Sequence, residues 1–489
     1  MNRGTVIMVA LALGSAALAW SMRPQEVAAG AYEDTGELLA PGFTDPTLAT
    51  SLEVVTWDEK SAKVVRFAVE QKQGRWVIPS HNDYPADGTE RMGKAAASFI
   101  DVKKDLYYGD NAAEQGSFGV LDPAGADGKG DERGQHITIK DASGATLVDV
   151  IVGKQIPEKQ GFYYLRAPSE KRVYGAKLEL DISTNFTDWI EKDLLHVERD
   201  EVVTMFYDPY TVDEQAGQVI GSKPIQAELE QVDGKDEWVA SAGVEVPEGK
   251  LLDPAKVKQI VTAIANIKIV GVRPRPEQLT PGKMQLTPQM QQVLQSKGFF
   301  LAPTGGGGAR LMGNEGEARV VTKDGVVYSL YFGEVTYDSG LALTAGAEEE
   351  GAEPAPVMEG EDPEDKKTAN RYMFVDVSYD PSMDKQGGAP EPAAEGEDAA
   401  KKLHGQARAQ QLQERFGSWF YVIPDMSYKQ VHKERTELWK AAPAPKDGGS
   451  APTAGTPGGA PTGGDTPAKP KPAPKPAPKD DGAAPPPSP

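Results

Sequence analysis

Histidine, serine and glycine motifs are the first places to look for catalytic or ligand-binding chemistry in this chain of 489 residues. The five histidines are His81, His136, His196, His404 and His432. No two of them have the spacing of metal ligands on one helix, and there is no cysteine to supply a thiolate ligand. A Gly-x-Ser-x-Gly motif is absent, and the glycine run at 305–308 lacks the Lys-Ser/Thr pair of a phosphate loop. The sequence therefore predicts no catalytic residue, no metal site and no cofactor.

Paired carboxylates are the remaining route to hydrolytic chemistry. Asp188 lies near Glu191, and Asp200 is followed by Glu201. Glycoside hydrolysis needs two such groups opposed across a cleft, one of them desolvated, and spacing along the chain does not show that arrangement. A hydrolase with dispersed carboxylates stays a remote alternative, and we expect that the protein is not an enzyme.

Aromatic side chains on expected strands are the best candidates for contact with a partner. They are Tyr163, Tyr164, Tyr174, Trp419 and Tyr421. Successive residues of a strand point to opposite faces, so one side of each set must face the core, and core packing is the default interpretation. The functional alternative is an exposed aromatic face that recognises a partner strand or a glycan.

The net charge of −21 is concentrated in two polar segments. Nine acidic side chains lie between Glu348 and Asp365, and four more lie between Glu391 and Asp398. These stretches are rich in Gly, Ala and Pro, so we expect solvated, extended inserts, with a cation- or partner-binding role as the alternative. The remainder is only mildly acidic. That balance argues against nucleic acid as a partner, because phosphate binding needs clustered Lys and Arg.

An uncharged apolar segment lies close to the N-terminus, at residues 5–20. Its roughly 15–18 apolar residues fall between a signal-peptide core and a spanning helix of about 20 residues. The triplet 17–19 (Ala-Leu-Ala) fits a cleavage site, whereas Trp20 and Arg23 fit an interfacial anchor. We expect a single N-terminal signal anchor in a membrane, with a cleaved signal peptide as the alternative. The bulk of the chain would then be periplasmic or extracytoplasmic.

The elements that position these residues alternate between strands and helices. A predicted hairpin at Lys63–Glu70 and Arg75–Pro79 precedes a predicted helix at Thr89–Lys104. A second hairpin at Ile225–Val232 and Glu237–Val239 precedes a helix with Asp253 as its N-cap and Pro254 at its first position. Strand pairs and aromatic strands then follow in one order in both halves, so the sequence predicts a duplicated α+β module of antiparallel sheet with packed helices.

The predicted division of the chain follows from this repeat. It comprises a signal anchor or signal peptide at 1–25, a linker at 26–50, a first module at 51–215, a second module at 216–440, and a disordered Pro/Ala/Lys-rich tail at 441–489. The second module carries acidic disordered inserts at 345–368 and 384–400, and a helix is expected at about 400–416.

Several of these elements carry a resemblance to a known family. They are the Trp76–Pro79 hairpin, the Tyr84–Asp87 helix entry, the Phe118–Pro123 element, and Val150–Gly153 followed by Phe162–Arg166. Together they resemble the bacterial family of domains of unknown function DUF4340, well over residues 54–207 and more loosely over 225–439. These motifs are specific for a fold and are silent on chemistry, and no catalytic residue of the family can be carried over.

The resemblance implies an envelope-anchored protein, often encoded beside subunits of gliding-type ABC transporters. We therefore expect a non-catalytic accessory or scaffold partner of an ABC-type transport or gliding-type assembly, held to the membrane by its N-terminal segment. A cell-wall or polysaccharide-binding spacer protein is the alternative. No small-molecule cofactor and no nucleic-acid partner are expected.

Overall fold

The computed structural model describes most of the chain between Asp34 and Ala442. The described residues are 34–59, 62–126, 128–213, 216, 218–279, 287–303, 309–338, 340–346, 369–384 and 404–442. The predicted signal anchor, part of the linker, the glycine run at 305–308, most of both acidic inserts and the tail after residue 442 lie outside them. Among the described residues, no helix is both long and apolar enough to cross a membrane.

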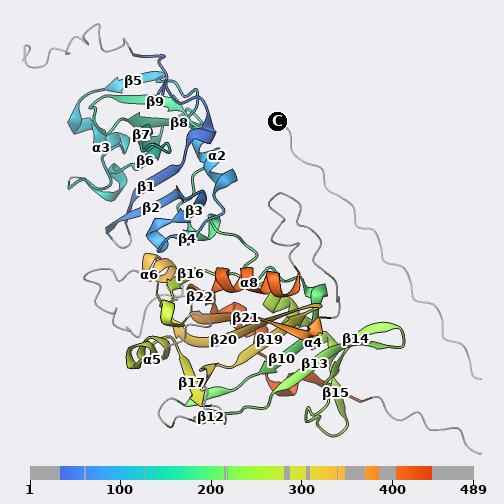
Figure 1. The fold of residues 1–489 in the computed structure, drawn as a ribbon. Helices are drawn as coiled ribbons and strands as arrows, with labels where there is room; N and C mark the ends of the chain where they lie inside the picture. Colours follow the sequence, from blue (N-terminus) through green and yellow to red (C-terminus); the bar gives the residue numbers. More distant parts are fainter. Residues whose placement is uncertain are drawn as a thin grey trace, which may run out of the picture. The chain divides into compact units, whose positions relative to one another are not determined.

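The fold is mixed α+β, with two large antiparallel sheets and several short helices (Figure 1). The first sheet has nine strands in the order β4-β3-β2-β1-β6-β7-β8-β9-β5. Its elements in chain order are β1 (Ser51–Asp58), β2 (Lys63–Lys72), β3 (Arg75–Ile78), β4 (Tyr84–Pro85), α2 (Thr89–Ala97), β5 (Leu106–Gly109), α3 (Gln115–Phe118), β6 (Gln135–Lys140), β7 (Thr146–Gln155), β8 (Phe162–Arg166) and β9 (Val173–Lys177). The alternating hairpins predicted for this region are present.

The second sheet has eight strands in the order β14-β13-β10-β19-β20-β21-β22-β16. Its strands are β10 (Val202–Asp208), β13 (Ile225–Val232), β14 (Lys235–Ala240), β16 (Gly271–Pro274), β19 (Glu317–Thr322), β20 (Asp324–Thr336), β21 (Asn370–Asp384) and β22 (Trp419–Pro424). Its helices are α4 (Pro254–Ala265), α5 (Pro288–Gln295), α6 (Gly340–Ala345), α8 (Gly405–Phe416) and α9 (Asp425–Val431). Three small pairs accompany it: β11 (Thr211–Asp213) with β12 (Gln218–Ile220), β15 (Lys250–Leu252) with β23 (Trp439–Ala441), and β17 (Phe299–Pro303) with β18 (Ala309–Gly313).

Eight strands of each sheet follow one another in the same order. The series β3-β2-β1-β6-β7-β8-β9-β5 corresponds to β14-β13-β10-β19-β20-β21-β22-β16. In both sheets the strand after the helix, β5 or β16, closes one end by pairing with the last strand, β9 or β22. A short 3-10 helix precedes the first strand of each, at Pro46–Leu48 and at Arg199–Glu201. The first sheet has a further strand, β4, outside its first hairpin, and among the described residues no strand takes that place in the second sheet.

Strand β10 lies in the second sheet, although the sequence analysis assigned it to the first module with a boundary at residue 215. It pairs with β13 on one side and β19 on the other. Nearly all of its residues are buried, as expected for a strand covered on both sides. The first sheet therefore ends before residue 202, and β10 corresponds to β1.

Residues of the second sheet alternate between two cores. Leu330 and Phe332 of β20 face the main core, which also receives α4 and α8. Tyr331 faces a smaller core with Phe374 and Phe420, covered by α5 and β17. This period of two is the normal consequence of strand geometry, and it leaves both faces of the second sheet covered.

The predicted helices are present with shifted ends. The Asp253 carboxylate accepts a hydrogen bond of 3.0 Å from the Ala255 amide, and Pro254 begins α4, which confirms the predicted N-cap. Helix α2 ends at Ala97 rather than near Lys104, and the chain then forms a turn with Asp101 at a positive φ of 58°. An aspartate tolerates that conformation better than most residues, but an α-helix does not continue through it.

Two glycines mark the same crossing in the two sheets. A Cβ on Gly153 of β7 would lie 2.5 Å from the Phe118 carbonyl oxygen, and one on Gly333 of β20 would lie 2.2 Å from that of Lys297. In each case the segment before the central hairpin passes directly over the strand, so any side chain would collide with backbone. The Val-Ile-Val-Gly and Phe-Gly motifs of the sequence therefore specify a backbone contact.

Candidate functional site

Helix α8 packs against β20 and β21 and carries a buried arginine in its apolar stripe (Figure 1). The buried residues of the helix are Gly405, Arg408, Ala409, Leu412 and Phe416. Arg408 is only 7% exposed. A buried guanidinium without partners is costly, so its surroundings must supply charge and hydrogen-bond acceptors. Arg408 therefore defines the most highly constrained polar cluster on this face of the sheet.

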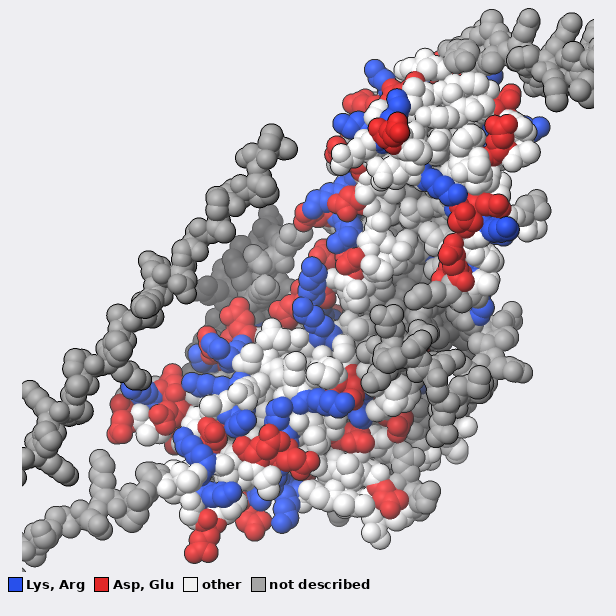
Figure 2. All heavy atoms as spheres, turned by 180° about the vertical axis from the view of Figure 1, so that it is seen from behind, with Lys and Arg blue, Asp and Glu red and all other residues white. Residues whose placement is uncertain are grey.

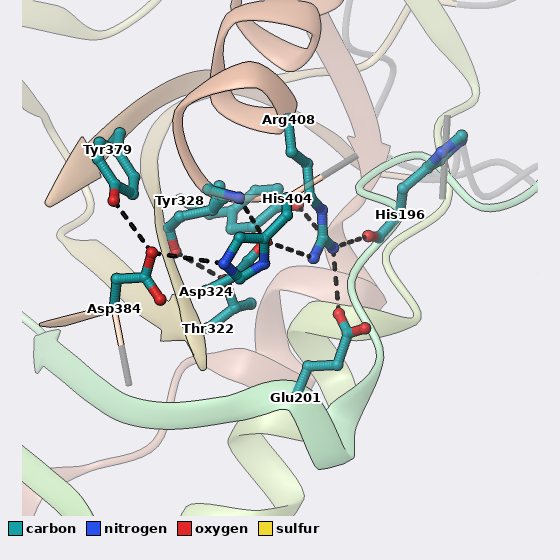
Figure 3. Close-up of polar contacts among 11 residues, drawn as sticks. His196, Glu201, Thr322, Asp324, Tyr328, Tyr379, Asp384, His404 and Arg408 are labelled. Carbon is teal, nitrogen blue, oxygen red and sulfur yellow. Dashed lines mark hydrogen bonds and ion pairs between the residues drawn. The ribbon is translucent and has the colours of Figure 1, made fainter. Parts of the chain in front are cut away.

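The Arg408 guanidinium joins three segments that are far apart in the sequence (Figure 3). Nη1 donates to the Asp324 carboxylate at 3.2 Å, and Nη2 donates to the Glu201 carboxylate at 3.1 Å and to the His196 carbonyl at 2.6 Å. The Tyr328 hydroxyl lies 3.4 Å from Nη2. One side chain thus connects α8, the sheet, and the segment that enters β10.

Asp324 is satisfied from several sides. The Gly405 amide donates to its Oδ2 at 3.2 Å, and the Thr322 hydroxyl donates to its Oδ1. Burial lowers the pKa of the Arg408 guanidinium, but the nearby Tyr328, Glu201 and Asp324 outweigh that effect and the pKa is raised. The guanidinium therefore stays charged, and its donors are engaged by acceptors of the protein. The chemistry available to this cluster is the positioning of chain segments.

The same cluster holds the two ends of the second acidic insert (Figure 3). Asp384 ends β21 and His404 precedes α8, and the ring Nε2 of His404 lies 3.4 Å from the Asp384 carboxylate. The Tyr379 hydroxyl donates to the same carboxylate oxygen at 3.0 Å. The described residues on both sides of the insert are therefore brought to one point on the sheet.

About two turns further along α8, Arg415 also contacts the connecting segment. Its Nη1 lies 2.9 Å from the Glu191 carboxylate and 2.8 Å from His196 Nε2. His196 Nε2 is 2.6 Å from the other Glu191 oxygen. Partial burial raises the pKa of Glu191, but hydrogen bonds from His196 and Arg415 more than reverse this and lower it to about 2. Two arginines of one helix thus hold the segment that links the two sheets.

Three of the predicted partner-binding aromatics belong to the core. Tyr174, Trp419 and Tyr421 are 2%, 8% and 0% exposed. Trp419 and Tyr421 are two residues apart on β22 and both face the main core. Phe420, between them, faces the smaller core, so both faces of β22 are covered. The Tyr174 hydroxyl donates to the Asp34 carboxylate. These three side chains therefore do not form an exposed aromatic surface, and core packing, the default interpretation, applies to them.

The other two predicted aromatics, Tyr163 and Tyr164, are half-buried on β8. The Tyr164 ring packs against those of Tyr108 and Phe118, with centroids 4.7 Å and 4.8 Å away. Tyr163 packs at the margin of the main core. Tyr163 and Tyr164 thus pack against different clusters, and their contact with a partner stays a prediction.

Two buried carboxyls on neighbouring strands, outside the arginine cluster, have raised pKa values. Asp208 of β10 and Glu317 of β19 are directly opposite in the sheet, and burial raises the pKa of both. Asp208 accepts hydrogen bonds from the Ser222 hydroxyl and the Lys223 amide, and Glu317 lies 3.3 Å from Arg310. Neither carboxyl lines the hollows found beside helices α2 and α4.

The charged surface is mixed in sign. Figure 2 shows acidic and basic side chains interspersed over the face that it presents. Within the described part of the chain, no group of three or more His, Asp or Glu side chains is arranged to hold a metal ion. Three adjoining hollows border α4, and the smallest, of about 200 Å³, has Trp238 in its wall.

Comparison with protein families gives one match, to a family described as "Domain of unknown function (DUF4340)", over residues 76–286. The chain contains a DUF4340 domain. This confirms the resemblance inferred from the hairpin and glycine motifs. No curated protein and no solved structure gives a significant match.

The DUF4340 match begins in β3, at residue 76, and ends at residue 286, just before α5. It therefore includes Glu191, His196 and Glu201, and it stops before Asp324 and Arg408. The cluster around Arg408 is formed between the matched region and the part of the chain that follows it.

Sequence reasoning missed this cluster, although one signal was present. In the helix expected at 400–416, Arg408 is in phase with Leu412 and Phe416, which predicts a buried cation. Its partner Asp324 is the first residue of β20, 84 residues earlier, and no spacing rule connects the two. The buried cation on α8 could therefore be predicted from the sequence, but the carboxylate of Asp324 that pairs with it could not.

Proposed function

We propose that the protein is a non-catalytic, membrane-anchored component of the bacterial cell envelope that serves as a scaffold partner of an ABC-type transport or gliding-type assembly. In this proposal the N-terminal segment anchors the chain in the inner membrane and the bulk of it lies outside the cytoplasm. The DUF4340 domain, the apolar residues 5–20 and the absence of cysteine from the chain support this assignment.

The proposal includes a duplication: the two sheets are tandem copies of one module. Its support is the shared order of eight strands, the 3-10 helix before the first strand of each, and the equivalent glycines Gly153 and Gly333. Two modules of one design, held in a fixed relation, present a larger and better-defined surface than one module does.

The observation that carries the scaffold role is that two arginines of α8 bind the segment that connects the two sheets. Arg408 and Arg415 hold the connecting segment against the second sheet through Glu201, His196 and Glu191. Together these contacts restrict the motion of the connecting segment: the Arg408–Asp324 pair is buried and costs about 3–5 kcal/mol to break, whereas the pairs made by Glu201 and Glu191, which are 40% and 41% exposed, contribute about 1 kcal/mol each. A spacer or scaffold needs that rigidity, whereas simple tethering does not.

The test is purification of the tagged full-length chain from membranes of its own bacterium in mild detergent, followed by identification of what accompanies it. Recovery of transporter subunits in a fixed ratio supports the proposal. A matched sample in which residues 1–25 are replaced by a cleavable signal peptide separates partner binding from shared membrane residence. Recovery of unrelated abundant proteins alone overturns the proposal, and retention on purified wall material without other proteins favours the polysaccharide-binding alternative.

A further inference from the structure

The outer edges of the two sheets differ in one respect. In the first sheet, β4 covers the edge of β3, with Tyr84 opposite Ile78 and Pro85 opposite Val77. In the second sheet, β14 holds the place of β3, and no described strand pairs with its outer side. The first sheet thus shows what kind of element could cover the edge of β14: a short extended segment such as β4.

Backbone hydrogen bonds locate the open positions on β14. The Ser241 amide donates to the Gln226 carbonyl, which makes these two a hydrogen-bonded pair across β13 and β14. In an antiparallel pair the next residue and every second one beyond it direct their amides and carbonyls away from the partner strand. Ala240 and Trp238 therefore direct their backbone groups outward.

The first sheet shows what such outward groups bind. There the Trp76 carbonyl accepts a hydrogen bond of 2.9 Å from the Ala86 amide, directly after β4. Trp76 and Trp238 occupy the outer strands of corresponding hairpins. No described backbone donor reaches the carbonyl of Trp238. Unpaired groups on a sheet edge are a template for a further strand.

The side chains around this edge also differ. In the first sheet Gly88, just after β4, lies so close to Trp76 that a Cβ on it would be 3.0 Å from the indole ring. In the second sheet a hollow of about 200 Å³ adjoins Trp238 and Leu229. The covering segment of the first sheet thus has an empty counterpart in the second.

The hollow favours an acidic segment. Its charged lining comprises Arg199, Lys258, Lys323, Asp200 and Asp236. The three cations exceed the two carboxylates in a chain whose net charge is −21. At its far end the edge carries Lys235, Asp236 and Glu237, which are exposed and discourage indiscriminate pairing. The stretch of β14 beyond these charges is short and less exposed, since Trp238 is 4% exposed and Val239 and Ala240 are half-buried.

We propose that the edge of β14 at Trp238–Ala240 is the docking site of the scaffold, and that it binds a short extended acidic segment of a partner protein by strand addition. This inference rests on the proposed scaffold function and names the chemistry of its partner. Main-chain hydrogen bonds to Trp238 and Ala240 hold the segment, and its following residue enters the hollow beside the indole ring.

A photo-crosslinking residue at Glu237 tests the site in membranes of the source bacterium. The matched control places it at Arg75, which is exposed at the start of β3, two residues before the part of that strand that β4 covers. We expect an adduct with another protein from position 237 and not from 75. Ala240→Pro removes one outward amide and should lower the yield roughly five- to tenfold, the effect of one hydrogen bond, whereas Ala240→Ser keeps it. Lys323→Glu should lower the yield as well.

Hydrogen exchange provides the second measurement. In the purified complex the amides of Trp238 and Ala240 should exchange more slowly than in the free chain. If Ala240→Pro fails to fold, Asp236→Pro removes the next outward amide and replaces it in the comparison. An adduct that resists both proline variants, equal adducts from positions 237 and 75, or an adduct between two copies of this chain overturns the inference. If transporter subunits co-purify but position 237 gives no adduct, this inference fails and the scaffold proposal stands; if nothing co-purifies, both fall.

Discussion

In the first sheet the buried Arg166 donates only to backbone carbonyls, at Val120, Ala167, Pro168 and Glu170. In the second sheet the buried Arg408 and Arg371 pair with the carboxylates of Asp324 and Asp425. Burial lowers the pKa of Arg166, whereas the carboxylates around Arg408 outweigh burial and the net shift is upward. Similar exposure therefore has opposite electrostatic outcomes, because the charge of Asp122 does not offset the burial of Arg166, whereas Glu201 and Asp324 pair directly with Arg408.

The difference shows what each arginine does. Arg166 organises one local loop, since all its acceptors lie within 46 residues. Arg408 connects positions up to 212 residues apart. A carbonyl-only arginine stabilises a turn that has already formed, and an ion-paired arginine fixes two segments that would otherwise be independent. Removing each one should therefore cost different amounts.

The largest effect is expected from Arg408→Met. It leaves the Asp324 carboxylate buried without its cation, which should lower the free energy of unfolding by about 3–5 kcal/mol. Arg166→Met leaves only carbonyls unsatisfied and should cost about 1–3 kcal/mol. Urea unfolding of the two variants measures both values. Equal losses would mean that the charge on Asp324 adds nothing, and the contrast between the two sheets would be wrong.

A smaller but symmetrical effect is expected from the crossing glycines. Gly333→Ala and Gly153→Ala both drive a Cβ into a backbone carbonyl, and each should cost about 3 kcal/mol. Gly93→Ala is the control, because nothing lies within 4 Å of its Cβ position in α2 and alanine favours a helix there. Thermal unfolding of the three variants tests the correspondence. Loss in only one of the crossing variants would contradict the equivalence of β7 and β20.

Much of this comparison could be predicted from local sequence. The hairpins, the N-cap at Asp253 and the order of the elements depend on residues near one another, so periodicity and turn chemistry reveal them. Strand β10 was assigned to the wrong sheet, since an apolar run shows that a strand is buried but not which neighbours it pairs with.

The Arg408 cluster and the open edge could not be predicted for the same reason. Asp324, Glu201 and Arg408 meet only when the sheet is assembled, and β14 looks open only beside a sheet in which β4 covers the corresponding strand. For the aromatics the sequence left core packing as the default and partner contact as the alternative, because alternation does not show whether the second face of a strand is covered. In β22 it is, by α5 and β17.

The contrast between neutral and paired sites extends to titratable groups. His81 is 2% exposed, its ring nitrogens are each 2.9 Å from a hydroxyl, of Ser80 and of Thr344, and burial followed by the charge of Arg273 lowers its pKa from 6.5 to about 4. The unfolded chain therefore takes up a proton below pH 6.5, and the folded chain does so only near pH 4. Stability should be complete above pH 6.5 and fall by roughly 3 kcal/mol towards pH 4.

His81→Gln tests this contribution, since it should flatten the pH dependence of unfolding between pH 6.5 and 4. Ser80→Ala is the control, because it removes one hydrogen bond but keeps the titrating ring and should keep the slope. An unchanged slope in His81→Gln would show that other groups carry the pH dependence.

The smallest effect is expected at the paired carboxylate, Glu191. Its pKa is lowered to about 2 from an ordinary 4.5, so its contribution is present above pH 4.5 and is lost as the pH falls towards 2. The side chain is 41% exposed, and screening limits the contribution to about 1 kcal/mol. Glu191→Gln should therefore be less stable than the natural chain at pH 6, and the difference should shrink to nothing near pH 2. Glu90→Gln removes the partner of an exposed pair on α2 and should change nothing measurable. If the Glu191→Gln deficit persists undiminished at pH 2, hydrogen-bond geometry rather than charge joins Arg415 to the connecting segment, and the two arginines of α8 do not act in the same way.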